Sequence, residues 1–288
     1  MRTISVGHSP DADDIFMYYA IKFGWVSLPE VKFENIALDI ETLNQATLKG
    51  VYDICAISFA LYPFVKDDFA LLKTAVSFGE GYGPKLIKKK GTKLKKNFKV
   101  ALSGEFTTNA LLFKIAYPDA RISYMNFLDI ENAVINGDVD AGVLIHESIL
   151  TYSSLLEVER EIWDIWVELC NGEELPLPLG GMCLRRSITL TEAIKYENVL
   201  IKAVDVANKN RKTLAPMLLE KGLIRVDAVT LDKYLDLYAN DNSVKMSQIQ
   251  YKALNKLFEL GYKSGHYQNL IKAEDFLIPS EYEELRAR

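Results

Sequence analysis

The chain has 288 residues, of which 49% are hydrophobic and 25% are charged, a balance typical of a globular protein whose core needs neither disulfides nor metal. Its net charge of −5 argues against nucleic acid or an anionic membrane as a partner, because neither attracts an acidic surface. The three cysteines, Cys55, Cys170 and Cys183, form no close pair, which argues against a disulfide framework and a Cys-x-x-Cys zinc site.

The N-terminus predicts no export signal. The opening MRTISVGHSP turns polar after a few residues, and no later segment reaches membrane-spanning length without a charge. A signal peptide needs an apolar stretch of about 7–15 residues and a spanning helix needs about 20. We therefore expect a cytoplasmic protein without a membrane partner.

The first part of the chain alternates between predicted strands and helices. A short strand in TISVGHSP precedes a helix over residues 13–23, whose apolar residues recur at helical spacing and whose start carries the run DADD. We expect those carboxylates to cap a solvated helix start. A strand over residues 31–36, a short helix ending at Gly50, and a buried strand in YDICAISF follow. This βαβαβ start predicts an α/β class.

Residues 85–96 hold seven lysines in KLIKKKGTKLKK. We interpret this run as a solvated turn where the chain leaves one lobe. A phosphate or nucleic-acid patch is the alternative, but the run lacks interleaved aromatic residues and lies in an acidic protein.

A second alternating series begins at Lys99. It predicts a strand in FKVALSG, a helix over residues 108–116, a strand in ISYMNF, a helix in ENAVING, a strand in AGVLIHES and a further strand near residues 162–169. The Pro- and Gly-rich ELPLPLGGM is expected to be a return crossing, and residues 187–271 are mostly helical. We predict a larger first α/β lobe from residues 1–90 and 185–288, and an inserted second lobe from residues 91–184. The cleft between the lobes is the natural ligand site.

Histidine is scarce, which makes the search for a catalytic base short. His266 is expected on the surface, and His8 either faces the cleft or caps a turn. His146 follows a strongly apolar strand, a position suited to the cleft, although a packed structural histidine fits that position equally well. No two histidines have metal-ligand spacing, and DADD lacks the glycine and distal glutamate of a calcium loop, so we expect no metal.

Two strand ends supply further candidates. In SGEFTTNALLF, Thr107 and Thr108 stand at a helix start, where their hydroxyls either cap the helix or bind a substrate carboxylate. In CAISF, Ser58 ends a strand of the other lobe. The glycines of GEGYGP fit a hinge or a tight turn lining the cleft better than a nucleotide fingerprint.

Taken together, these motifs resemble the 1,4-dihydroxy-6-naphthoate synthase family, which serves the futalosine route to menaquinone. The resemblance runs in order over the first two-thirds of the chain, through HSPDADDIFMYYA, DIETLNQATLKG, AISFALYPFV, GEGYGP, SGEFTTNALL, AGVLIHESILTY and LPLPLGG. It departs in the opening motif, where Asp11, Ala12, Asp13 and Ile15 stand in place of Cys, Pro, Asn and Thr.

The resemblance implies a two-lobed type II periplasmic-binding-protein-like fold, each lobe a mixed sheet flanked by helices. It also implies a carbon–carbon lyase that converts cyclic dehypoxanthinyl futalosine, a small anionic substrate, into 1,4-dihydroxy-6-naphthoate and dihydroxyacetone without a cofactor. The family's base falls on His146. Its substrate contacts fall on Ala56, Ile57, Ser58, Thr107 and Thr108.

Two other functions remain open at this stage. Chorismate dehydratase of the same pathway shares the fold, and a cytosolic small-anion-binding protein without catalysis would need the same cleft. The HES–TY element containing His146 favours the naphthoate synthase. Which residues support His146, and what Asp11, Asp13 and Asp14 do, is left to the structure.

Overall fold

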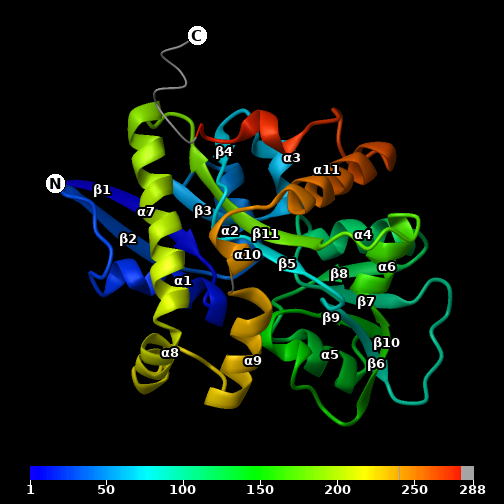
Figure 1. The fold of residues 1–288 in the computed structure, drawn as a ribbon. Coiled ribbons are helices and arrows are strands. Elements are labelled where there is room, and N and C mark those ends of the chain that lie inside the picture. The colour runs from blue at the N-terminus through cyan, green and yellow to red at the C-terminus, as the bar shows by residue number, and fades with distance from the viewer. Residues whose placement is uncertain (240, 280–288) are drawn as a thin grey trace.

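The computed structural model describes residues 1–239 and 241–279 and contains two β-sheets, each flanked by helices (Figure 1). The buried apolar side chains of both halves form one continuous core. Within the described residues, no helix is both long and apolar enough to span a bilayer. The expected α/β class with a mixed sheet in each lobe is confirmed.

The first sheet has the strand order β2-β1-β3-β11-β4, with β5 paired to β11. The strands β1, β2 and β3 are parallel, whereas β11 runs antiparallel to β3. The strand bounds are β1 Arg2–His8, β2 Val31–Ala37, β3 Ile54–Ser58, β4 Phe69–Leu71, β5 Ser77–Gly79 and β11 Leu177–Arg185. The Pro- and Gly-rich return is therefore a long strand inside this sheet.

Helices from both ends of the chain cover the first sheet, and α7 packs along α1 (Figure 1). Side-chain caps fix several helix starts: Asp39 accepts from the Thr42 N–H at α2, and Ser247 forms a capping box at α11. The helix bounds are α1 Ala12–Lys22, α2 Ile40–Leu48, α3 Tyr62–Val65, α7 Leu190–Lys209, α8 Arg211–Glu220, α9 Ala228–Tyr238, α10 Asp241–Val244 and α11 Gln248–Lys263.

The second sheet has the order β10-β6-β9-β7-β8. Parallel pairing joins β7 to β8 and β9, and antiparallel pairing joins β6 to β9 and β10. The bounds are β6 Lys85–Lys89, β7 Lys99–Leu102, β8 Arg121–Tyr124, β9 Ala141–Leu144 and β10 Leu156–Glu161, with helices α4 Thr108–Ala116, α5 Ile130–Asn136 and α6 Ile162–Leu169.

Two local expectations are wrong. The first half of the lysine run is strand β6, in which Leu86 and Ile87 are fully buried and Lys88 pairs with Glu159 of β10 at 2.5 Å. The segment Ile162–Leu169 is helix α6 rather than a strand, because its buried residues Ile162, Ile165 and Trp166 recur at helical spacing.

Sheet membership bears on where the chain crosses between lobes. The chain leaves the first sheet after β5 and enters the second at β6, then returns at β11. We therefore propose crossings within residues 80–84 and 170–176, a few residues before the boundaries predicted at 90/91 and 184/185. Residues 280–288 of the predicted first lobe lie outside the described residues.

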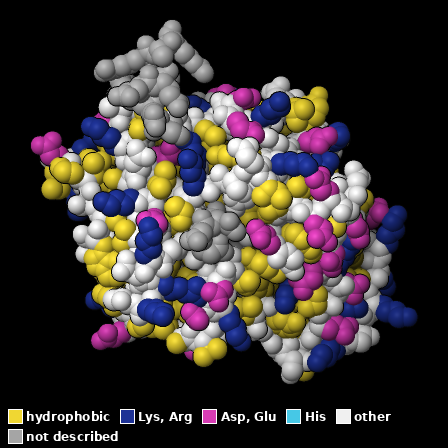
Figure 2. Space-filling model, viewed as in Figure 1, with side chains coloured by type: hydrophobic (Ala, Val, Ile, Leu, Met, Phe, Trp, Pro, Cys, Tyr) yellow, Lys and Arg dark blue, Asp and Glu magenta, His cyan; other side chains and the backbone are white. Residues whose placement is uncertain are grey.

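On the face seen in Figure 2, basic and acidic side chains are interspersed.

Candidate active site

A cavity of about 800 Å³, part of it open to solvent, lies between the two lobes. The first lobe contributes the loop after β1, the end of β3 and residues of β11, and the second contributes the start of α4 and the turn after β9. The six site residues that the sequence suggested all line this cavity: Ala56, Ile57, Ser58, Thr107, Thr108 and His146.

The backbone presents His146 in an unusual conformation. Strand β9 ends at Leu144, and His146 begins a short 3₁₀ turn with φ of +55°. Left-handed backbone is unfavourable for a residue with a β-carbon, so the surroundings must hold it. Ser148 Oγ donates to the Ile145 carbonyl at 2.6 Å, and the Phe127 ring lies edge-on to the imidazole, with 5.0 Å between centroids. The ring is thus held by backbone and packing, with one-fifth of the side chain exposed.

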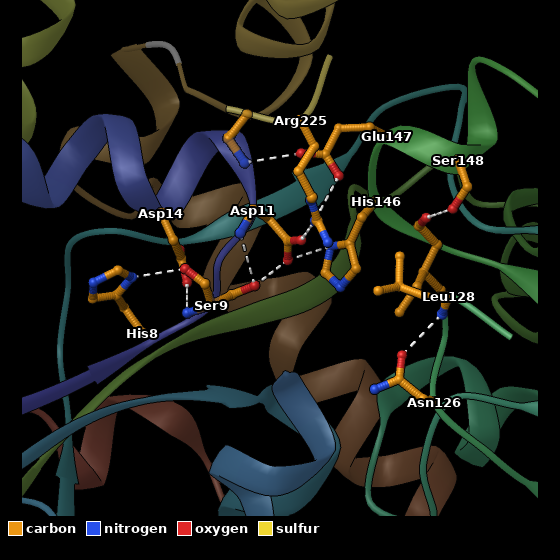
Figure 3. A network of polar contacts seen from close by, with 12 residues as sticks. His8, Ser9, Asp11, Asp14, Asn126, Leu128, His146, Glu147, Ser148 and Arg225 are labelled. Atoms are coloured by element: carbon orange, nitrogen blue, oxygen red, sulfur yellow. Dashed lines mark hydrogen bonds and ion pairs between the residues drawn. The ribbon is translucent and has the colours of Figure 1, made fainter. Parts of the chain in front are cut away.

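Asp11 joins the two lobes at this point (Figure 3). Its Oδ2 lies 2.7 Å from Nδ1 of His146 and also accepts from the Ser9 hydroxyl, while its Oδ1 lies 2.7 Å from the Arg225 guanidinium. The carboxylate is 1% exposed. The expectation of a solvated helix start is therefore wrong for Asp11, whose side chain leaves α1 uncapped and turns to the other lobe. The side chain of Asp13 lies outside the described residues.

Glu147 forms a second bridge between the lobes. Its Oε1 accepts from the Ala12 N–H at 3.1 Å, and its Oε2 lies 3.2 Å from Arg225. Arg225 belongs to the loop between α8 and α9 and also stacks over the Phe127 ring, at 5.3 Å. One cation therefore serves two buried carboxylates from opposite lobes.

The pKa values of the three carboxyl groups differ because their surroundings differ. Burial raises the pKa of Asp11, but the charge and hydrogen bond of His146, the Ser9 hydroxyl and the Arg225 charge outweigh burial, so the pKa lies below its ordinary value. Burial and the neighbouring Asp11 raise the pKa of Glu147. The same two causes, with burial the larger, raise the pKa of Asp14 to about 7, although the Ser9 N–H donates to it at 2.7 Å.

The cavity lining also contains several hydrogen-bond donors. Ser58 Oγ accepts from Asn44 Nδ2 at 3.2 Å, which leaves the Ser58 hydroxyl hydrogen directed elsewhere. The buried Ser103 hydroxyl has no partner among the described residues, and neither have the first N–H groups of α4, on Thr108 and Asn109. Unpaired helix N–H groups favour an anion.

The hydroxyls of Thr107 and Thr108 are already committed to protein partners. Thr107 caps α4, accepting from the Ala110 N–H at 3.3 Å and donating to the Gly104 carbonyl at 2.9 Å. Thr108 donates to the Leu179 carbonyl at 3.0 Å and accepts from the Ala60 N–H, thereby tying α4 to the first lobe. A bound anion would meet the amides of this turn rather than these hydroxyls.

The other two histidines have structural surroundings. His8 lies outside the lining of the main cavity, donates from Nδ1 to the Ser9 carbonyl at 2.7 Å and accepts from Asn35 at Nε2, and burial lowers its pKa. His266 is partly exposed and contacts Ser264. The described residues contain no group of three metal-ligating side chains arranged to hold an ion.

Sequence reasoning missed four residues of this site. Glu147 directly follows His146 and Ser103 opens the motif that contains Thr107 and Thr108, so a closer look at each strand end could have found them. Asn44 lies within α2, and its link to the cavity is the hydrogen bond to Ser58, which the sequence does not reveal. Arg225 has no local signal, because its partner Asp11 is 214 residues away in the chain.

Comparison with known proteins gives a consistent result. A model of the family described as "Menaquinone biosynthesis" matches residues 4–263. Two relatives named 1,4-dihydroxy-6-naphtoate synthase are each 29% identical to this chain. The match to the protein of Streptomyces coelicolor covers 91% of this chain and 94% of that protein, and the match to the protein of Thermus thermophilus covers 90% of this chain and 93% of that protein.

Solved structures agree on the architecture. Protein AF1704 from Archaeoglobus fulgidus is 32% identical with a TM-score of 0.84, over 92% of this chain and 98% of that one. The periplasmic aliphatic sulphonate-binding protein SsuA of Escherichia coli is 12% identical with a TM-score of 0.64, over 96% and 92%, a likeness of fold alone. The predicted two-lobed, periplasmic-binding-protein-like fold is confirmed.

Proposed function

The chain belongs to the menaquinone-biosynthesis family, and we propose that it is a carbon–carbon lyase that splits cyclic dehypoxanthinyl futalosine into 1,4-dihydroxy-6-naphthoate and dihydroxyacetone. His146 is the base. The observation that carries this proposal is the position of His146, which lines the interlobe cavity while its Nδ1 contacts the buried Asp11 carboxylate. A cytoplasmic location and an anionic substrate are part of the proposal.

The reaction needs removal of one proton, a retro-aldol type of carbon–carbon cleavage, and aromatisation of the new ring. Aromatisation supplies the driving force, so the protein has to supply a base, a fixed substrate and a dry site. A positioned imidazole typically contributes about 10²–10⁴-fold to such a proton transfer. His146 is suited to this step because contacts with Phe127 and Asp11 fix the orientation of its ring.

The hydrogen-bond donors of the cavity lining supply the anchor. The amides of Thr108 and Asn109 and the hydroxyls of Ser58 and Ser103 would hold the substrate carboxylate, and the apolar part of the lining, including Ile57 and Leu179, would cover the ring. Glu41 of the first lobe accepts from the Phe106 N–H of the second at 3.2 Å, so the two lobes are also in contact next to the start of α4.

The test is turnover of the cyclic substrate by wild type, His146→Ala and His266→Ala, with product followed by its naphthoate absorbance. We expect His146→Ala to lose turnover by at least about 10²-fold while substrate binding measured by calorimetry changes little, and His266→Ala to match wild type. Full activity of His146→Ala would refute the base. Conversion of chorismate instead of the cyclic substrate would identify a dehydratase, and binding without turnover by wild type would identify a binding protein.

A further inference from the structure

We propose that Asp11 is a positioning residue for the reaction: its carboxylate holds the Nδ1–H of His146 and thereby leaves the lone pair of the reactive imidazole on Nε2. This inference rests on the proposed function of His146 and adds a partner that neither the sequence motifs nor the comparisons assign. The juxtaposition that carries it is the 2.7 Å contact between the two side chains across the lobe interface.

An ionised carboxylate accepts hydrogen bonds and cannot donate one. Asp11 is ionised near neutral pH because its pKa lies below the ordinary value. A neutral His146 beside it must therefore carry its hydrogen on Nδ1, so that only Nε2 can take a proton from substrate. When Nε2 takes that proton, the adjacent negative charge stabilises the imidazolium that forms.

The remaining contacts of Asp11 keep it in this geometry. The Ser9 hydroxyl shares Oδ2, and Arg225 occupies Oδ1 at 2.7 Å. The other charged groups near the carboxylate are Glu147, whose own oxygens face the Ala12 N–H and Arg225, and Asp14, which accepts from the Ser9 N–H. Asp11 is thus the carboxylate that contacts the imidazole, although Glu147 is its neighbour in sequence.

The two side chains come from different lobes. Asp11 stands in the loop between β1 and α1, and His146 in the turn after β9. The contact therefore depends on the arrangement of the two lobes, and with it the tautomer of the base.

The experiment compares Asp11→Asn with wild type and with the control Asp53→Asn. The control makes the same change in the first lobe. The Asp53 carboxylate accepts hydrogen bonds of 2.9 Å from the N–H and the hydroxyl of Ser5, and it does not line the cavity. An amide at position 11 can donate to Nδ1 and reverse the tautomer, which costs up to about 10⁴-fold in kcat. We expect a loss of about 10²–10⁴-fold in kcat with KM within about threefold. The acidic limb of the pH–rate profile should move to lower pH, because the imidazolium loses its partner.

A second readout does not depend on activity. The chain has only three histidines, so the ring nitrogens of His146 can be assigned by nuclear magnetic resonance against His146→Ala. We expect Nδ1–H in wild type bound to product and Nε2–H in Asp11→Asn, with partial recovery of kcat in Asp11→Glu. Should Asp11→Asn not fold, the wild-type spectrum alone decides the question.

Failures of the two proposals are distinguishable. If His146→Ala keeps full activity, the base assignment fails and this inference fails with it. If His146→Ala is inactive but Asp11→Asn keeps the wild-type kcat and pH profile, only the positioning role is overturned. An Nε2–H tautomer in wild-type protein with product bound would also overturn it.

Discussion

Asp14 is a partly buried carboxyl group that the fold holds at a cost in stability. Its pKa is raised to about 7, mainly by burial and further by the charge of Asp11, against an ordinary value of 3.8. Its contact with the Ser9 N–H at 2.7 Å offsets only part of this effect. Replacing it by asparagine keeps an acceptor for that N–H and removes the charge.

The sign of the pH effect follows from proton binding. Between about pH 4 and pH 7 the folded chain keeps a proton on Asp14 that the unfolded chain has released, so stability falls as pH rises through this window. A pKa shift of about 3 units corresponds to about 4 kcal/mol. Because Asp14 is only partly buried, solvent screening reduces this cost. We expect the charged Asp14 to lower the free energy of unfolding by about 2 to 4 kcal/mol above pH 7.

The assay is urea unfolding of wild type and Asp14→Asn at about pH 5 and about pH 8. We expect Asp14→Asn to be more stable by about 2 to 4 kcal/mol at the higher pH and to lose most of that advantage at the lower pH. The quantity to plot is the difference in unfolding free energy between the two proteins. The pKa of His8 is lowered from its ordinary value of 6.5, so His8 makes the stability of both proteins rise with pH below that value, and the difference removes this effect. Asp67→Asn, at a side chain that is 83% exposed, is the control. Parallel curves for wild type and Asp14→Asn would refute the reasoning.

Three further substitutions probe the lobe interface and the anchor. Arg225→Met should destabilise the protein by about 1–3 kcal/mol in urea unfolding, because Asp11 and Glu147 lose their shared cation although Arg225 is partly exposed; unchanged stability would contradict this. Gly104→Ala should raise KM about tenfold with little change in melting temperature, because a β-carbon there would meet the Glu41 side chain and hold the lobes apart. Ser103→Ala should raise KM by about 10–100-fold through loss of a donor to the carboxylate, with kcat nearly unchanged.

The fold could be predicted from sequence where local pattern and tertiary environment agree. Apolar residues at helical spacing predicted α1 and α4 within a residue or so of their bounds. The prediction succeeded because the residues that each helix buries recur at that spacing in its own sequence. Strand β6 was missed because its lysines looked solvated. Lys88 pairs with two glutamates of β10, some seventy residues later in the chain, and no local pattern contains these partners.

The site was predictable to the same extent. His146 and Ser58 follow or end buried strands, so topology alone directs them to the cleft. The environment of Asp11 was not predictable. A carboxylate at a helix start is usually solvated, and no residue near Asp11 in the sequence indicates that Arg225, 214 residues away, contacts it.

The charges at the lobe interface serve alignment more than stability. Asp11 and Glu147 are both buried, and a buried carboxylate that lacks a partner costs several kcal/mol. Closure with the lobes slightly out of register would separate Asp11 from His146 and Glu147 from the Ala12 N–H and incur that cost. Closure in register satisfies the same groups and sets the imidazole at once. The buried charge therefore penalises the misaligned closed forms, while the apolar core beneath the sheets supplies the stability that permits such a cluster to be kept.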